Sequence, residues 1–299
     1  PEEMDQVSSR GYAMGYIGGG LLLAINLVMI MVLPELVPSI DAALMTRLSF
    51  VTVAIWWFVF TLPVLTRVKE PPRRIEAHEE GFTPIKASFR RLYATFKEIR
   101  KYRDLSLGLL AFWVYANGIG TIIVMATAYG NELGFGQTTL IGTLLMVQFL
   151  AAPFAILFGW LSKKIGTKKS IYLSLSIYTV IAIAGYFLYH EWQFWVLGAA
   201  VATVQGGSQA LSRSFIGKMM PKSKSADFFG FFSVFEKFAS ILGPAIFGVV
   251  STIMGESRLS IASLVIFFAI GMILLKNVNM ERGIAVAQQE ELELVSIAE

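Results

Sequence analysis

The chain has 299 residues, of which 55% are hydrophobic and 15% charged, and it contains no cysteine. Its mean hydropathy of +0.63 lies outside the range of an ordinary soluble domain, and the lack of thiols excludes disulfides and thiolate metal sites. The chain has only two histidines for acid–base chemistry. We therefore predict an all-α integral membrane protein, not an enzyme, with no metal and no cofactor.

Apolar runs long enough to cross a hydrocarbon core recur along the whole chain. Their continuous Leu, Ile, Val and Phe content is typical of helices and not of alternating barrel strands. We predict eight transmembrane helices, at 11–33, 46–66, 106–130, 138–161, 169–189, 192–216, 228–253 and 258–275. The predicted division is two helices (1–66), a basic linker (67–105), six helices (106–276) and a tail (277–299).

The first predicted span begins RGYAMGYIGGGLLL, in which glycines recur every four residues and share one helix face. Such a face lets a partner backbone approach closely. The seventh span carries GPAIFG, whose first and last glycines align with those of GYIGGG in the first span. This alignment favours parallel internal repeats, which are common in transporters. The predicted helix-packing residues are Gly11, Gly15, Gly19, Gly20, Gly243, Pro244 and Gly248.

The basic residues indicate an orientation in the membrane. Of the 25 Lys and Arg, all but Arg47, Lys237 and Arg258 fall on one side of the predicted spans. By the positive-inside rule, both ends and the linker are then cytoplasmic, and the net charge of +4 needs no nucleic acid to explain it. Within the linker, Thr83-Pro84 is typical of a helix start, and a basic amphipathic helix follows. It is either a solvated connector or a lipid-binding element, and the tail is a frayed helix or disordered.

The loop GWLSKKIGTKK between the fourth and fifth spans resembles the cytoplasmic loop signature of the major facilitator superfamily. Its glycines allow a tight turn between helices, and its lysines can bind lipid headgroups or helix C-termini. An ordinary positive-inside loop is the alternative. The signature residues are Gly159, Leu161, Gly166, Lys168 and Lys169.

Longer stretches resemble one family within that superfamily. They are SSRGYAMGYIGGGLLL (8–23), LLAFWVYANGIGTII (109–123), QGGSQALSRSF (205–215) and PKSKSADFFGFFSVFEKFASILGP (221–244). These stretches are similar to the vacuolar amino-acid effluxers associated with autophagy in yeast and to their bacterial relatives. The resemblance implies that the predicted spans correspond to the last eight helices of a twelve-helix facilitator, so that the chain is a fragment lacking the first four.

The chain departs from the family pattern at two positions. Lys163 stands where the loop signature usually has an aspartate, which weakens any charge-relay role for this loop. Asn117 stands where family members commonly carry an aspartate, and an amide binds ligands but does not titrate. A proton-carrying role at Asn117 is therefore in doubt.

Polar residues at membrane depth are costly and commonly face a bundle interior or a wet cavity. Asn117, Gln148 and Gln205 lie roughly ten to thirteen residues into their predicted spans, near the midplane. Glu236 is the candidate for carrying a proton. The candidates for lining a substrate cavity are Tyr115, Asn117, Thr121, Gln148, Gln205, Gln209, Arg213 and Lys237.

Each of these residues also has a purely structural interpretation. The amides can join helices by hydrogen bonds, and Arg213 can extend to the membrane surface. Neighbouring helices can neutralise Glu236 and Lys237.

We predict a secondary active transporter that moves a small polar solute, with amino acids as the implied class, by alternating access. Protons are a partner that the sequence leaves open. The expected location is the bacterial cytoplasmic membrane, and the full-length form is expected to be a monomer. The alternative is a non-transporting membrane scaffold or biogenesis protein on the same fold.

Overall fold

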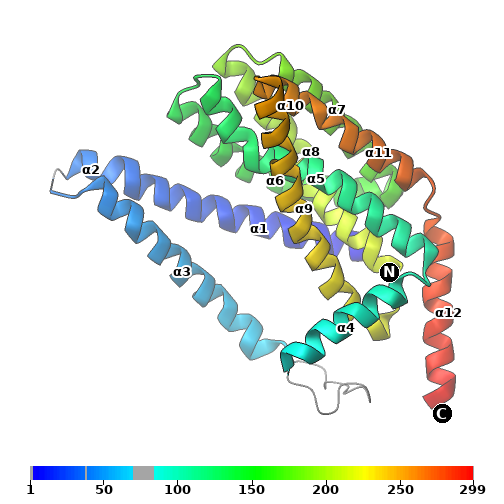
Figure 1. Ribbon diagram of the computed structural model, residues 1–299. Helices are drawn as coiled ribbons and strands as arrows, with labels where there is room; N and C mark the ends of the chain where they lie inside the picture. Colours follow the sequence, from blue (N-terminus) through cyan, green and yellow to red (C-terminus); the bar gives the residue numbers. More distant parts are fainter. Residues whose placement is uncertain (1–2, 38, 70–83, 299) are drawn as a thin grey trace.

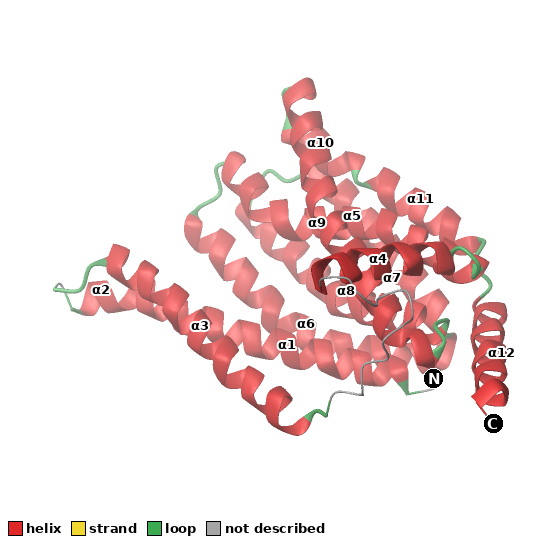
Figure 2. Ribbon diagram, turned by 60° about the horizontal axis from the view of Figure 1, so that its bottom comes forward, coloured by secondary structure: helices red, strands yellow, loops and turns green. Residues whose placement is uncertain are grey.

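The structure is a computed structural model that describes residues 3–37, 39–69 and 84–298, all of whose regular elements are helices (Figures 1 and 2). A π-helical turn, η1 (Val28–Val32), joins α1 to α2, and a short 3-10 helix, η3 (Lys222–Lys224), precedes α9. The helices are α1 (Met4–Leu27), α2 (Leu33–Leu36), α3 (Ala42–Arg67), α4 (Pro84–Ile99), α5 (Arg103–Glu132), α6 (Gln137–Ile165), α7 (Thr167–Tyr186), α8 (Glu191–Lys218), α9 (Ser225–Met254), α10 (Ser257–Ser263), α11 (Val265–Lys276) and α12 (Met280–Ala298).

Seven helical segments among the described residues are long and apolar enough to cross a membrane. They are Met4–Leu36, Ala42–Arg67, Arg103–Glu132, Gln137–Ile165, Thr167–Tyr186, Lys222–Met254 and Ser257–Lys276. The predicted count of eight is therefore not confirmed. The predicted span that is absent from these seven is α8. Its stretch QGGSQALSRS makes this helix too polar to be recognised as membrane-spanning by composition.

The interior of the fold explains how α8 tolerates this polarity. It packs along α6, α7 and α1, so that much of its surface faces other helices. Beside it, α5 packs along α9 and α11. Large side chains such as Tyr115, Phe215 and Phe268 fill the space between these helices. By contrast, α3 packs mainly against α1 and η1. In Figure 1, α1 and α3 lie beside the part of the chain that runs from α5 to α11, which we call the six-helix part after its six predicted spans.

The predicted packing glycines fall into two groups. A Cβ atom on Gly243 would lie 2.1 Å from the Thr121 Oγ1 atom and 2.5 Å from the Asn117 carbonyl oxygen, so α9 crosses α5 at its backbone. Gly19 and Gly20 lie close to Gln148 of α6 in the same way.

Gly11, Gly15 and Gly248 differ, because a Cβ atom on any of them would have no neighbour within 4 Å in the described part of the chain. Pro244 lies within α9 and is half-buried. The two aligned motifs thus serve different contacts, since α1 packs on α6 and α8 whereas α9 packs on α5 and α10.

The linker helix α4 is described from Pro84 to Ile99, and the predicted start at Thr83-Pro84 lies at the edge of the described residues. Leu92, Phe96 and Ile99 pack into the core, and the Phe96 ring contacts the Phe231 ring of α9. Phe89 lies three residues before Leu92 and seven before Phe96, a spacing that places it on the same helix face, but it is 71% exposed.

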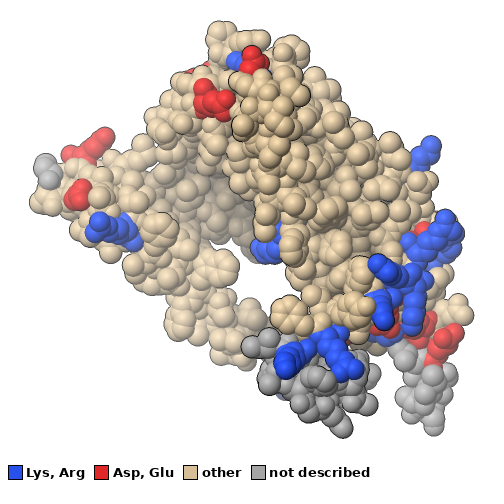
Figure 3. All heavy atoms as spheres, viewed as in Figure 1, with Lys and Arg blue, Asp and Glu red and all other residues tan. Residues whose placement is uncertain are grey.

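The tail does not fray. Helix α12 is held by Arg282, whose side chain is bonded to Asp104, and by Glu290, which accepts hydrogen bonds from Tyr102 and Lys224. On the face shown in Figure 3, lysines and arginines gather over α4 and the neighbouring ends of α5 and α12. The tail is thus joined to the rest of the fold through Asp104, Tyr102 and Lys224.

Candidate functional site: a central cavity and its surroundings

Two adjoining hollows lie between α1 and the six-helix part. The larger, of about 540 Å³, is lined by Ser8, Gly11, Tyr12, Gly15, Tyr16, Gln148, Gln209 and Arg213. The smaller, of about 220 Å³, lies between α1, α5, α8 and α9, and its lining includes Tyr115, Glu236 and Lys237. Tyr12 and Gln209 line both hollows, so we treat them as one space and call it the central cavity.

Two tyrosines of α1 contribute to the wall and were not singled out from the sequence. The Tyr16 hydroxyl donates a 2.7 Å hydrogen bond to Gln209 Oε1, and Tyr12 lines both hollows. Gly11 and Gly15 each precede one of these tyrosines, and their missing side chains leave the cavity open. The spacing of four residues in GYAMGY was the available signal, because it puts both tyrosines on one helix face, next to the face that carries the glycines.

Three charged side chains border the central cavity. Arg213 is exposed and its guanidinium lies 5.1 Å from the centre of the Phe229 ring, while Glu236 is half-buried and Lys237 exposed. Within the part of the chain that the structure describes, none of the three forms an ion pair. The cavity thus offers both signs of charge to a ligand. This arrangement suits a zwitterion.

The predicted α5 residues divide between the cavity and a helix crossing. Tyr115 lines the cavity, is 1% exposed and shares a 2.7 Å hydrogen bond with Ser212. Asn117 donates to the Trp113 carbonyl at 2.6 Å, and Thr121 donates to the Asn117 carbonyl at 2.6 Å. Neither Asn117 nor Thr121 is among the lining residues of the described cavities, and both lie where α5 meets Gly243 of α9.

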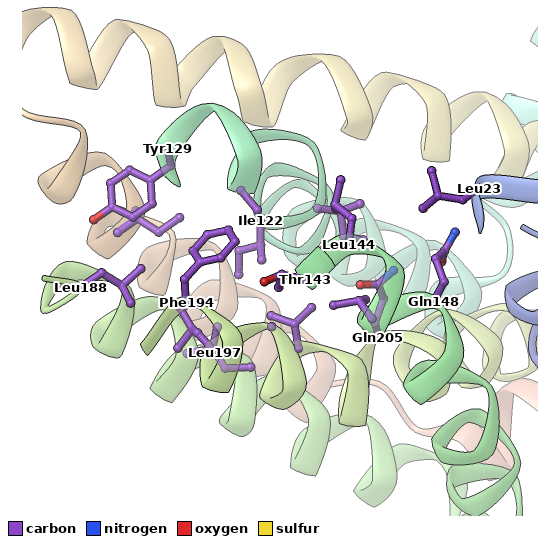
Figure 4. Close-up of a pocket in the computed structure, with 17 residues that line it drawn as sticks. Leu23, Ile122, Tyr129, Thr143, Leu144, Gln148, Leu188, Phe194, Leu197 and Gln205 are labelled. Atoms are coloured by element: carbon purple, nitrogen blue, oxygen red, sulfur yellow. The ribbon is translucent and has the colours of Figure 1, made fainter. Parts of the chain in front are cut away.

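A third cavity, of about 250 Å³, lies mainly between α5, α6 and α8 (Figure 4). Its lining is mostly aliphatic and aromatic, so we call it the apolar pocket; it contains Gln205 and Thr143 among its few polar residues. Gln148 lines both the apolar pocket and the central cavity, which makes the two spaces neighbours. Of the predicted amides, Gln148, Gln205 and Gln209 are therefore all cavity residues.

The loop signature forms a tight turn between α6 and α7. Gly166 has a φ of +91°, a conformation that favours glycine, and a Cβ atom on Gly159 would lie 2.6 Å from the Ser9 Oγ atom of α1. The Lys168 ammonium donates to the carbonyls of Lys276 and Val278 at the end of α11. Lys169 is exposed and Leu161 half-buried.

Beside this loop lies a buried acid that sequence reasoning missed. Asp5 of α1 is 4% exposed, and its Oδ2 atom lies 2.8 Å from the Lys218 ammonium of α8. The same carboxylate accepts hydrogen bonds from Ser214 and, at 2.7 Å, from Thr167 at the start of α7. Asp5 thus joins α1 to the six-helix part at the loop end. No sequence motif marked it, since its partners are about 160 and 210 residues away.

Comparison with known proteins shows which family this chain belongs to. Residues 2–288 match the family described as "Vacuole effluxer Atg22 like". The chain belongs to this family. It is 41% identical over 293 residues to an uncharacterized MFS-type transporter, YxiO, of Bacillus subtilis, in an alignment covering 97% of this chain and 67% of that protein.

The chain is also similar to fungal proteins. Autophagy-related protein 22-1 of Aspergillus niger is 27% identical over 300 residues, covering 93% of this chain and 48% of that protein. Autophagy-related protein 22 of Yarrowia lipolytica is 26% identical over 307 residues, covering 93% of this chain and 51% of that protein. The chain therefore spans two thirds of the bacterial relative and about half of the fungal ones.

Family membership agrees with the predicted resemblance and with an integral, multi-pass membrane protein. The family description and the name of the bacterial relative denote transport proteins and not enzymes. This is the class that the sequence predicts.

Proposed function

We propose that the protein is a secondary active transporter that moves a small polar solute across a membrane by alternating access. The observation that carries the proposal is the central cavity, which gathers cationic, anionic, amide and hydroxyl groups between α1 and the six-helix part. A cavity with a few convergent polar groups is the usual form of a ligand site. The transporter name of the bacterial relative supports the same activity.

The solute that fits this cavity is a zwitterion such as an amino acid. In this proposal Arg213 or Lys237 attracts the carboxylate and Glu236 attracts the ammonium group. Gln148 and Gln209 donate and accept the remaining hydrogen bonds. Protons remain a candidate coupling ion, carried by Glu236.

The proposed topology has eight spans, with α8 as the eighth and both ends of the chain in the cytoplasm. Helix α8 is screened from lipid by its neighbours, which supports a span that is not apolar enough on its own. The clustering of cations at the end of the molecule that carries α4 supports a cytoplasmic location for that end. We assign the protein to a bacterial cytoplasmic membrane because of its relation to the Bacillus protein.

The test is uptake and counterflow of a labelled amino-acid mixture in liposomes that hold the purified full-length protein, with and without an imposed pH gradient, because this chain spans about two thirds of its bacterial relative. Saturable flux that the double variant Arg213→Gln, Lys237→Gln abolishes is the expected result. The control variant is Lys97→Gln, which removes an exposed cation from α4 and leaves the lining of the central cavity intact. Absence of flux from verified folded protein contradicts the proposal and favours a non-transporting scaffold.

A further inference from the structure

Helix α4 presents one face to the core and a different one outward. Leu92, Phe96 and Ile99 pack inward against the core of the six-helix part. The outward residues recur at helical spacing, and at 3.6 residues per turn they fall within an arc of about 100°. We call this arc the basic face of α4. Its exposed members are Lys86, Phe89, Arg90, Tyr93, Lys97 and Arg100.

The basic face combines cations with large aromatic rings and contains no acid. Phe89 is 71% exposed and Tyr93 is 61% exposed, and the Lys97 ammonium lies 5.2 Å from the centre of the Tyr93 ring. The single acid of α4, Glu98, lies off this face and is paired with Lys224. Exposed rings are poorly suited to water, whereas aromatic and basic side chains are typical of the membrane interface.

The position of α4 in the fold places this face at the boundary of the membrane. Helix α4 ends at Ile99, and the membrane-spanning helix α5 begins at Arg103, a distance of at most about 15 Å along the chain. The contact between the rings of Phe96 and Phe231 ties α4 to the first turns of α9, a second apolar segment long enough to cross the membrane. In Figure 1, α4 runs across the direction of α3 and α5, as a helix lying along the membrane surface does.

We propose that the basic face of α4 docks on the anionic lipid headgroups of the membrane leaflet beside it. Charge complementarity identifies this occupant, because the face offers four cations and no acid. Each cation near an anionic surface adds roughly a fivefold preference. The rings of Phe89 and Tyr93 insert among the headgroups, a contact that a free phosphate ion does not provide. This role is independent of the proposed transport function.

The test is hydrogen exchange of the α4 amides in the purified full-length protein, held in nanodiscs. One set of nanodiscs contains phosphatidylcholine alone, and the other contains phosphatidylcholine mixed with anionic phosphatidylglycerol. We expect the α4 amides to exchange at least about fivefold more slowly beside the anionic lipid, since docking opposes local opening of the helix. The difference should shrink in 1 M salt, where charges are screened over about 3 Å.

Two triple variants of equal charge separate this face from general electrostatics. The first, Lys86→Gln with Lys97→Gln and Arg100→Gln, should remove the difference between the two lipid compositions. Its exchange in neutral nanodiscs should match the unmodified protein, because the inward residues are retained. Lys97→Gln alone keeps three of the four cations of the basic face, so it remains a control in the transport test.

The matched control removes three exposed lysines outside α4 and should keep the difference. It combines Lys163→Gln, Lys164→Gln and Lys276→Gln. A further variant, Phe89→Ser with Tyr93→Ser, keeps every cation of the basic face. It should weaken the protection by anionic lipid, because a lipid surface is bound through the rings as well as the cations.

Three results would overturn the proposal. Equal exchange of α4 in both kinds of nanodisc, fast or slow, would assign its outward face to water or to another segment of the full-length protein. Loss of the difference in the matched control would assign it to overall charge. Equal protection by inorganic phosphate added to the protein in neutral nanodiscs would assign it to a free anion. No arm measures flux, so failure of the transport proposal is detected separately.

Discussion

Asp5 supplies a carboxylate that the loop signature lacks. Lys163 stands where the signature of similar facilitators usually has an aspartate, and in the structure Lys163 is exposed. The acid comes instead from α1 and reaches Thr167 at the start of α7 and Lys218 at the end of α8. An isolated buried charge is expensive, whereas a paired and hydrogen-bonded one is tolerated. The pair therefore fixes one position of α1 against the loop.

We predict that Asp5→Asn destabilises the protein, because it leaves the Lys218 ammonium buried without a counter-charge. Breaking a buried pair in this way costs about 3–5 kcal/mol. Thermal unfolding in detergent measures the loss, and Lys218→Met added to Asp5→Asn should restore most of it. Asp104→Asn is the control, since its partner Arg282 is 50% exposed and can be hydrated. An equal loss in both single variants would contradict the assignment.

Glu236 is the residue whose replacement tests proton coupling. It lines the central cavity and brings a carboxyl group to it. If it carries the coupling proton, Glu236→Gln should make the remaining flux indifferent to an imposed pH gradient and should also weaken solute counterflow, because the ammonium group loses its counter-charge. Flux that still follows the gradient in this variant rules out Glu236 as the carrier.

At the scale of elements, glycines of similar spacing have different roles, and a pair of substitutions separates them. Gly15→Leu should reduce flux without lowering Tm, because its side chain enters the central cavity, where it meets no atom within 4 Å of the Cβ position. Gly243→Leu should lower Tm, because the Cβ atom would overlap the Asn117 carbonyl of α5. Overpacking commonly costs about 1–3 kcal/mol. A larger fall in Tm for Gly15→Leu than for Gly243→Leu would contradict this interpretation.

The docking of α12 should depend on pH. Partial burial acts to raise the pKa of Glu290, but hydrogen bonds from Lys224 and Tyr102 outweigh it and hold that pKa below its ordinary value of 4.5. The contribution of Glu290 is therefore fully present above pH 4.5 and is lost as pH falls through its lowered pKa.

Hydrogen exchange in α12 measures this effect at a series of pH values after correction for the intrinsic exchange rate. Protection should fall as the medium is acidified towards pH 3. Glu290→Gln should show weaker protection that no longer changes with pH in this range. A pH dependence shared by both proteins would assign the effect to another group.

At the scale of the molecule, much of the architecture was predictable because apolar runs must be buried in lipid or in protein. The ends of most helices lie within a few residues of the predicted spans. The tail was not predictable as an ordered helix. It is held by two pairs between groups distant in sequence, Arg282 with Asp104 of α5 and Glu290 with Lys224.

The candidate site was predictable in part. Gln148, Gln209, Arg213 and the adjacent Glu236 and Lys237 do line the central cavity. Asn117 and Thr121 have the same polarity and depth but serve the crossing of α5 and α9. The sequence gives the polarity of a residue and its depth in a span. Whether the residue faces a cavity or another helix depends on how the helix is rotated, which the sequence does not show.

Composition and periodicity by themselves determined that this chain is helical and membrane-embedded, because these properties are summed over many residues, and the resemblance of particular stretches to a family related it to transport proteins. The tertiary structure alone decided that Asp5 pairs with Lys218 and that the tyrosines of α1 border the central cavity. Each of these depends on two or three groups brought together by chain segments far apart in sequence. Such contacts leave no local pattern, since they depend on how whole helices are placed and rotated.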